Sequence, residues 1–296
     1  MDSKHLRYQK YAAALLCLVC LAGLFGCSPP YKEEAPTPPQ STPVPEETVP
    51  SLHFDGRRYA FSGSAEAIRA EGAVITICQG GRYRISGTLK EGTLSVAVPR
   101  GEVVHLLLDG VSITSSAASP LQITSAACVI LESATGSVNR LADTPSDIAA
   151  GSVIEAACPL LLRGEGNLIL SGRRAYGIHG TDDVILESGH LTLSAPKDAL
   201  WVRDRFELIG GRLTVTEAAR GIVVGEGRTD EGQLRFCGGD VVIQCADTAL
   251  SATRSIVAEG GTGSLRARRR YICTLVENEI ETAGIIAIAE NWLLAG

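Results

Sequence analysis

Two aspartates stand at equivalent positions of neighbouring sequence units. Asp182 and Asp204 each lie four residues beyond an apolar residue of their own unit. If the units stack as strands, the two carboxylates come to lie about 5 Å apart and repel each other unless a cation or an arginine intervenes. Calcium takes about six to eight oxygen ligands, which carboxylates and backbone carbonyls supply. The pair predicts either a calcium site or a solvated turn whose charge Arg203 or Arg205 balances.

Aromatic side chains form a second candidate group. His179 and Trp201 each follow an apolar residue at the same position of successive units, and Tyr176 lies one unit below Trp201. Because Leu200 is expected to point inward, Trp201 is expected to point outward, where its ring would meet the face of a sugar. The alternative is that Trp201 packs in a corner of the coil.

A run of arginines near the end of the chain forms the third group. In the sequence "LRARRRY", Arg266, Arg268 and Arg270 alternate. On one strand, alternate residues share a face, so the three guanidinium groups could clamp the carboxylates of an acidic sugar chain. The alternative, which we favour, is protection of the last strand edge, because charges discourage edge-to-edge pairing.

Catalytic signatures are weaker. Hydrolysis of a glycosidic bond needs a close pair of carboxylates, and the acids of this sequence are scattered along it. The five histidines show no pairing, and the sequence contains no phosphate loop or Ser-His-Asp signature. We therefore expect a protein without enzymatic activity, with a polysaccharide lyase or hydrolase as the alternative.

These groups sit in a repeating sequence. The segments "SGHLTL" from Ser188, "GGRLTV" from Gly210 and "GGDVVI" from Gly238 share one pattern. Each unit has two short runs of alternating apolar residues around a glycine turn, with no amphipathic helical pattern. The first two steps of the repeat have equal length and the third is longer, as the apolar markers of successive units show: Ile178, Leu200, Ile222 and Leu250. The long step contains "GEGRTDEG", which reads as an inserted loop.

This period predicts an all-β solenoid, a parallel β-helix with rungs of roughly 22 residues. A single unit cannot bury its apolar side, but stacked units fill an interior with ladders of leucine and valine. A β-sandwich also has short alternating strands, but it would not keep turn glycines and inward pairs in register over several units. The inward residues are expected to be Leu191, Leu193, Leu213, Val215, Val241 and Ile243.

Composition narrows the partners and the compartment. The net charge of −6 argues against nucleic acid as a partner. Six cysteines follow residue 27, none in a C-x-x-C pair, so a structural zinc site is not expected. Several lie within apolar runs, which favours free thiols packed in the core.

The N-terminus is predicted to be a targeting segment. Three basic residues precede an apolar run that ends in "LAGLFGC", and this pattern resembles a bacterial lipobox with Cys27 as the lipidated residue. We expect residues 1–27 to be a lipoprotein signal peptide and residues 28–55 to be a proline-rich tether. Residues 56–296 are then the β-helical domain, held outside the cytoplasm at the cell surface by acyl chains in the membrane. An ordinary cleaved signal or a membrane anchor is the alternative.

Several segments resemble the carbohydrate-binding-domain lipoproteins of Gram-positive anaerobes. The similarity covers roughly residues 64–265 and rests on "GGRYRISGTL", "VVHLLLDGVSITSSAASPLQITSAACVILESATGSVNRLAD" and the "GNLILSG…YGIHGTDDVILESGHLTL" units. The resemblance implies a right-handed parallel β-helix that binds cellulose-like and acidic plant polysaccharides and carries calcium. The family's units carry Asp-Gly-Ile, and its aspartate helps to hold calcium.

This sequence departs from that pattern. Of the four matching positions, only Asp198 keeps the acid, while Tyr176, Arg220 and Thr248 occupy the others. The resemblance therefore implies a calcium role for Asp198 beside Asp182 and Asp204. The function expected from residues and resemblance together is polysaccharide binding without catalysis. A structural surface protein or adhesin without sugar affinity is the remaining alternative.

Lipid attachment at Cys27 can be tested by substitution. Cys27→Ala should release the protein into the medium or leave an uncleaved precursor, because about 0.8 kcal/mol of membrane affinity per buried CH₂ is lost with the acyl chains. The measurement is fractionation of cells followed by immunoblotting, with Cys20→Ala as the matched control. Unchanged membrane partition of the mature Cys27→Ala protein would contradict this assignment.

Overall fold

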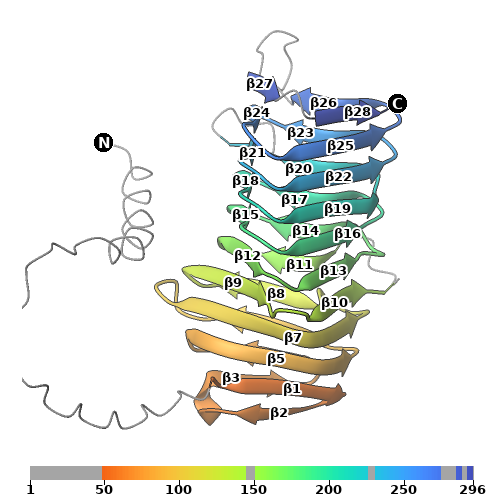
Figure 1. The fold of residues 1–296 in the computed structure, drawn as a ribbon. Helices are drawn as coiled ribbons and strands as arrows, with labels where there is room; N and C mark the ends of the chain where they lie inside the picture. Colours follow the sequence, from red (N-terminus) through yellow and green to blue (C-terminus); the bar gives the residue numbers. More distant parts are fainter. Residues whose placement is uncertain (1–48, 145–150, 226–230, 275–284, 289–291, 296) are drawn as a thin grey trace, which may run out of the picture. The chain divides into compact units, whose positions relative to one another are not determined.

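The structure is a computed structural model that describes residues 49–144, 151–225, 231–274, 285–288 and 292–295. These residues form a parallel β-solenoid (Figure 1). Their one helical element is a short 3₁₀ turn, Ala65–Ala67, and none of them belongs to a helix suited to crossing a membrane. Cys27 and the predicted signal peptide lie outside the described residues, as does most of the loop expected in "GEGRTDEG".

Three stacks of strands make up the coil. The first stack is a ten-stranded sheet, which lies behind the other strands in Figure 1. We call it the front sheet because it carries the candidate site described below. Its strands are β3 (Ile68–Glu71), β4 (Val74–Ile77), β6 (Thr93–Ala97), β8 (Leu121–Ser125), β11 (Ser152–Ala156), β14 (Tyr176–Gly180), β17 (Asp198–Val202), β20 (Arg220–Val224), β23 (Thr248–Ala252) and β26 (Arg270–Thr274).

The other two stacks belong to one eighteen-stranded sheet. The long strands β5 (Gly81–Lys90) and β7 (Val103–Ser115) serve both stacks, and after them the stacks separate. The second stack continues through β9 (Cys128–Ser133), β12 (Leu160–Gly164), β15 (Val184–Leu186), β18 (Arg205–Leu208), β21 (Gln233–Phe236), β24 (Ser255–Ala258) and β27 (Ile285–Ile288). The third continues through β10 (Val138–Asp143), β13 (Asn167–Ser171), β16 (His190–Ser194), β19 (Arg212–Glu217), β22 (Asp240–Cys245), β25 (Thr262–Ala267) and β28 (Trp292–Ala295).

The register confirms the period expected from the sequence. In the front sheet Tyr176 pairs with Asp198 and Asp198 with Arg220, so two successive rungs have the length of the regular sequence unit. The next rung pairs Ile222 with Leu250, which is the longer step seen in the sequence. Rungs nearer the N-terminus are less regular, and over the whole coil a rung has about 24 residues.

The N-terminal end is closed by antiparallel strands. β1 (Ser51–Gly56) pairs with β2 (Arg58–Ser62) antiparallel and with β5 in parallel, and β3 pairs with β4 antiparallel. All but the last residue of β1 therefore lie within residues 28–55, which we assigned to the tether, and the coil begins before the "GGRYRISGTL" segment. The hairpins give the first rung partners on a side where no earlier rung can pair.

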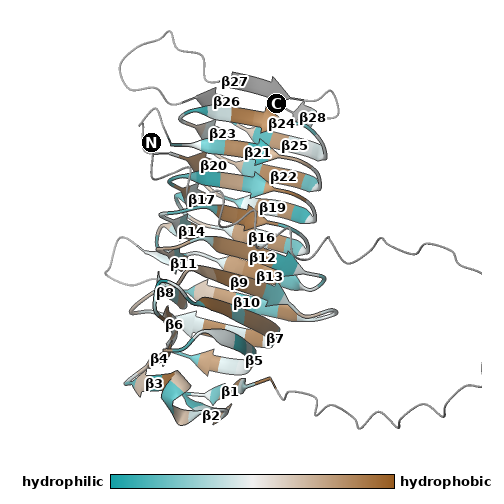
Figure 2. Cartoon of the chain, turned by 90° about the vertical axis from the view of Figure 1, so that its left-hand side faces the viewer, coloured by the Kyte–Doolittle hydropathy of each residue, from teal (hydrophilic) through white to brown (hydrophobic). Residues whose placement is uncertain are grey.

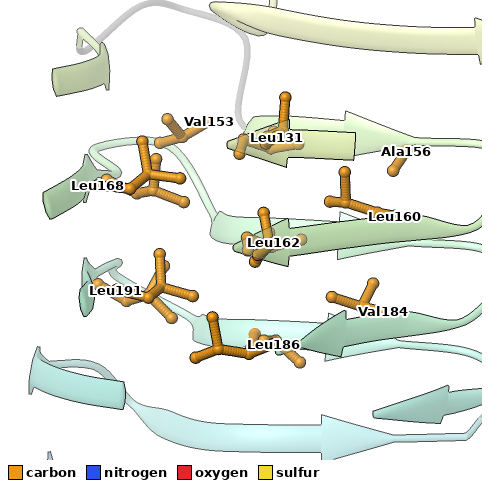
Figure 3. Close-up of a cluster of buried hydrophobic side chains, with 14 of the residues drawn as sticks. Leu131, Val153, Ala156, Leu160, Leu162, Leu168, Val184, Leu186 and Leu191 are labelled. Carbon is orange, nitrogen blue, oxygen red and sulfur yellow. The ribbon is translucent and has the colours of Figure 1, made fainter. Parts of the chain in front are cut away.

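The predicted inward ladders are confirmed. Leu191, Leu213 and Val241 occupy one column, and Leu193, Val215 and Ile243 the next. All six side chains are at most 2% exposed. Figure 3 shows the same arrangement one to two rungs nearer the N-terminus. There Leu168 lies next to Leu191, Leu160 next to Val184 and Leu162 next to Leu186. Apolar side chains thus stack rung on rung through the interior.

Repeated glycines close the turns before β16, β19, β22 and β25. Gly211, Gly239 and Gly261 have φ of 79°, 77° and 76°, a region that glycine enters without steric cost. A Cβ at each would also run into the carbonyl oxygen of the corresponding glycine one rung below. The glycine directly before each of these strands is required by this close approach of backbones.

The cysteines of the coil are free thiols where the structure describes them. Cys158 and Cys245 are buried, whereas Cys78, Cys128 and Cys237 are partly exposed. Burial raises the pKa of Cys128 to about 11 and that of Cys158 to about 12. The expectation of free thiols agrees with this arrangement, although they divide between the core and its margin.

A charge inside the ladder should be far costlier than one outside it. Leu213→Asp buries a carboxylate among apolar side chains and should lower the free energy of unfolding by at least about 3 kcal/mol. Thr214→Asp, on the outward side of the same strand, should change it by less than about 1 kcal/mol. Urea denaturation followed by circular dichroism measures both. Equal effects of the two substitutions would show that the register is wrong.

Candidate functional site

Parallel pairing in the front sheet brings the predicted aromatic residues together. Glu155 of β11 pairs with His179 of β14, and His179 pairs with Trp201 of β17. Ile154, Ile178 and Leu200, the residues just before them, are fully buried in the core, so these three side chains point away from it. Tyr176 lies on the same strand as His179. The structure therefore places Tyr176, His179 and Trp201 on one outer surface, as we expected.

The three rings stack on one another. The Tyr176 and His179 ring centroids are 5.2 Å apart with an interplanar angle of 30°. The His179 and Trp201 centroids are 4.5 Å apart at 22°. We call Tyr176, His179 and Trp201 the ring ladder.

This stacking corrects the expected mode of sugar contact. The His179 ring stacks with both Tyr176 and Trp201. Val223, which is 1% exposed, takes the next position of the column above Trp201. Ring faces that we expected to meet a sugar are therefore engaged with neighbouring rings, which leaves mainly ring edges for contact with a ligand.

Polar groups that the sequence reasoning missed surround the ladder. Glu155 Oε1 lies 2.6 Å from His179 Nδ1, and the Ser152 hydroxyl donates to Glu155 Oε2 over 2.7 Å. On the other flank, Lys197 Nζ donates to the Tyr176 hydroxyl over 2.7 Å and lies 4.9 Å from its ring centroid. The regular repeat of the sequence did not lead to Glu155. The step from Glu155 to His179 is longer than the regular steps that follow it, so only the actual rung length reveals the pairing.

Asp198 is held by an arginine. Its side chain is fully buried, and both carboxylate oxygens accept hydrogen bonds from Arg220, over 2.6 Å from Nε and 2.7 Å from Nη2. The hydrogen bonds to Asp198 raise the pKa of Arg220. A guanidinium group thus lies beside the carboxylate for which the resemblance implied calcium.

Arginines also lie beside the acids at the next turn. Arg203 Nε donates to Asp204 over 3.1 Å, and Arg205 Nη2 donates to Asp183 over 2.9 Å. Asp182 accepts from the backbone N–H of Asp183 over 2.8 Å. Burial raises the pKa of Asp183, and the Asp182 and Asp204 carboxylates add to that rise.

This geometry matches the alternative of a solvated turn whose charge Arg203 and Arg205 partly balance. Across the residues with assigned positions, no group of three or more His, Cys, Asp or Glu side chains is arranged to hold a metal ion. Calcium binding at Asp182 and Asp204 stays a prediction.

The three arginines do not share one strand face, contrary to our expectation. Arg266 lies on β25, Arg268 follows the end of that strand, and Arg270 begins β26 in the front sheet. A turn of the coil separates Arg266 from Arg270, so they cannot form a straight clamp. All three are exposed, and β26 is the edge strand of the front sheet as far as the described residues extend. This position fits the edge-protection alternative.

Comparisons with known proteins agree with this architecture. A carbohydrate-binding domain-containing protein of Acetivibrio thermocellus is 30% identical over 128 residues, which cover 41% of this chain and 45% of that protein, so the match spans less than half of the relative. The solved structure of a polysaccharide lyase-like protein from C. thermocellum, a gadolinium derivative, superposes with a TM-score of 0.74 at 25% identity. It covers 82% of this chain and 98% of that one.

The strongest assignment comes from a family model. The model described as "Carbohydrate-binding domain-containing protein" matches residues 71–290, which is most of the coil. The chain therefore belongs to the carbohydrate-binding domain-containing protein family.

Proposed function

We propose that this protein binds polysaccharide at the cell surface without cleaving it, and that the glycan lies along the ring ladder. The observation that carries the proposal is the ladder itself. It gathers three aromatic side chains of an aromatic-poor chain on one outward surface, in a member of a carbohydrate-binding family. Phe, Trp and Tyr make up only 5% of the sequence, and the ladder places two of them beside a histidine, so this clustering is distinctive.

The exposed edges define how a glycan would be held. Ring edges carry the positive end of the aromatic quadrupole and meet hydroxyl oxygens favourably. The Lys197 ammonium and the Tyr176 hydroxyl add polar groups on one flank. Successive rungs are about 4.8 Å apart, so a polymer running along the coil axis meets the rings of β14 and then the ring of β17 on two adjacent rungs. Several weak contacts along one chain then add up to useful avidity.

The carboxylates beside the ladder support binding without hydrolysis. Glu155 is engaged by His179 and Ser152, and Asp198 by Arg220. A hydrolase needs one carboxyl group to protonate the leaving oxygen and a second to act as base or nucleophile. Within the described part of the ladder surface, each of these acids already has a structural partner.

A lyase is the second candidate function. Two observations favour it: the similar solved structure is named polysaccharide lyase-like, and Glu155 lies within 2.6 Å of His179 Nδ1. A histidine oriented by a carboxylate leaves Nε2 as a general base. It would take the proton beside a uronate carboxyl group as the bond to the leaving oxygen breaks, and a carbon–carbon double bond would form.

The location outside the cytoplasm belongs to the same proposal. Lipid attachment at Cys27 would hold the protein at the membrane, and the proline-rich segment before β1 would lift the coil away from it. Extracellular glycans would then be within reach of the ladder.

Substitution of the ladder tests the function. Trp201→Ala should weaken retention on insoluble polysaccharide about five-fold, because the contact of one aromatic ring contributes about 1 kcal/mol. Amorphous cellulose and immobilised polygalacturonate are the probes, and affinity electrophoresis is the measurement. Tyr59→Ala is the matched control, because Tyr59 is an exposed aromatic residue of the N-terminal hairpin.

The controls separate binding from folding and from catalysis. Circular dichroism of Trp201→Ala should show an unchanged β-sheet spectrum and thermal midpoint. If retention falls only together with the fold, Trp201 serves packing and the proposed site is wrong. Release of unsaturated uronides, detected by the ultraviolet absorbance of the new double bond, would establish the lyase instead.

A further inference from the structure

The second stack of strands has an outer surface that the ring ladder does not use. Figure 2 looks onto the side of the coil that carries β9, β12, β15, β18 and β21. Ile130, Leu161 and Ile185 follow one another in a single outward column of this stack. Each is partly exposed, while the residues on either side of each in the sequence point to the core or to the turns. We call these three residues the apolar strip.

Basic residues dominate the end of this surface that is nearer the N-terminus. Glu132 is surrounded by cations there, with Arg163 Nη2 at 2.9 Å and Arg82 Nη2 at 3.6 Å. His105 Nε2 lies 2.8 Å from the same carboxylate, and burial lowers its pKa, which favours the neutral imidazole. Arg84 pairs with Asp109 at 2.9 Å. Three arginines against two acids leave this end with a net charge of +1.

Acidic residues dominate the opposite end. Glu207 lies between Arg205 at 3.4 Å and Arg235 at 3.6 Å. Arg205 also pairs with Asp183, and Arg235 with Glu259. Glu187 is exposed directly after β15, between the two networks. Four acids, namely Asp183, Glu187, Glu207 and Glu259, against two arginines leave this end with a net charge of −2.

The surface is therefore basic at one end, apolar in the middle and acidic at the other. A second copy turned end for end would place its acidic end on the basic end of the first, with Leu161 and Ile185 of the two apolar strips in contact at the centre. A copy in the same orientation would place like charges together. This pattern fits a twofold, isologous interface, in which one patch meets itself in reverse order.

We propose that this surface is a docking site for a second copy of the chain, and that the two coils associate antiparallel through their second stacks. A twofold axis that runs parallel to the strands keeps each column opposite itself and reverses the order of the rungs. With the axis between β12 and β15, Leu161 meets Ile185 of the second copy, and Arg163 meets its Glu187. Arg84 then lies opposite Glu259 at each end of the interface.

The size of the surface sets the strength of the association. Eight strands from β5 to β24 at about 4.8 Å spacing give a length of about 34 Å, and three columns of side chains give a width of about 14 Å. The two copies together would bury about 1,000 Å², near the lower limit for a specific interface. The dimer is therefore weak and depends on concentration, and its charge pairs make it weaken with added salt.

Sedimentation velocity of the full-length chain in mild detergent, over a concentration series, tests the dimer. The wild-type protein should show a monomer–dimer equilibrium. Leu161→Glu should raise the dissociation constant at least ten-fold, because a charge replaces the centre of the apolar strip. Ile169→Glu is the matched control, since Ile169 is a partly exposed outward aliphatic residue of β13 in the third stack, and it should leave the constant unchanged.

Exchange of charges tests the antiparallel register. Arg163→Glu and Glu187→Arg should each weaken the dimer, whereas an equimolar mixture of the two variants should associate, because each substituted charge then meets its opposite. A wild-type chain that stays monomeric, or a dimer that neither Leu161→Glu nor the charge variants weaken, overturns the proposal. So does equal weakening by Ile169→Glu. Glycan retention should be the same for Leu161→Glu and for the wild-type protein. If Leu161→Glu loses retention while both proteins are monomeric, this surface holds the glycan and the dimer proposal is wrong.

Discussion

Parallel backbone pairing between successive rungs is the interaction on which the structure depends. Each strand donates and accepts hydrogen bonds upward and downward, so a residue at one position of a rung lies directly over its counterpart in the rung below. The glycine turns preserve this register, because Gly211, Gly239 and Gly261 let the backbone of one turn rest on that of the next. A side chain at these positions would push the rungs apart and break the columns. The interior ladders of leucine and valine follow from the same constraint.

The constraint acts on the outer surface as it does on the core. A column of outward residues is a row of side chains about 4.8 Å apart, which is close to the thickness of stacked aromatic rings plus a small offset. His179 and Trp201 therefore stack on each other more readily than either presents a face to a ligand. Charged columns behave alike, since Asp198 meets Arg220 one rung above, and Glu132 meets Arg163. Side chains that are neighbours in a column stack or form ion pairs with one another, and a ligand can contact only the ring edges and polar groups that these interactions leave exposed.

This competition explains what the sequence could and could not predict. The period, the inward residues Leu213 and Val215 and the shared surface of His179 and Trp201 are all consequences of register, and register is visible in the spacing of glycines and apolar residues. The orientation of the rings depends on which side chains stand above and below, and Glu155 comes from a rung of different length. Arg266 and Arg270 do not share the strand face that we considered for a clamp, because the chain bends after Ala267, and the alternating basic pattern in the sequence does not reveal that bend. The first strand, Ser51–Gly56, was hidden by the prolines that precede it.

The coil also explains how one small domain can keep different surfaces independent. The front sheet and the second stack are separated by the apolar core, so side chains of the ring ladder and of the apolar strip do not touch. Within one surface, however, columns link many rungs, and a charge placed on one rung is felt mainly by the rungs directly above and below it. Charges of opposite sign can therefore gather at the two ends of one surface without neutralising each other, as they do around Glu132 and Glu207. A globular domain with short strands and no repeat would mix such charges over its surface, whereas a solenoid keeps them in order along its axis.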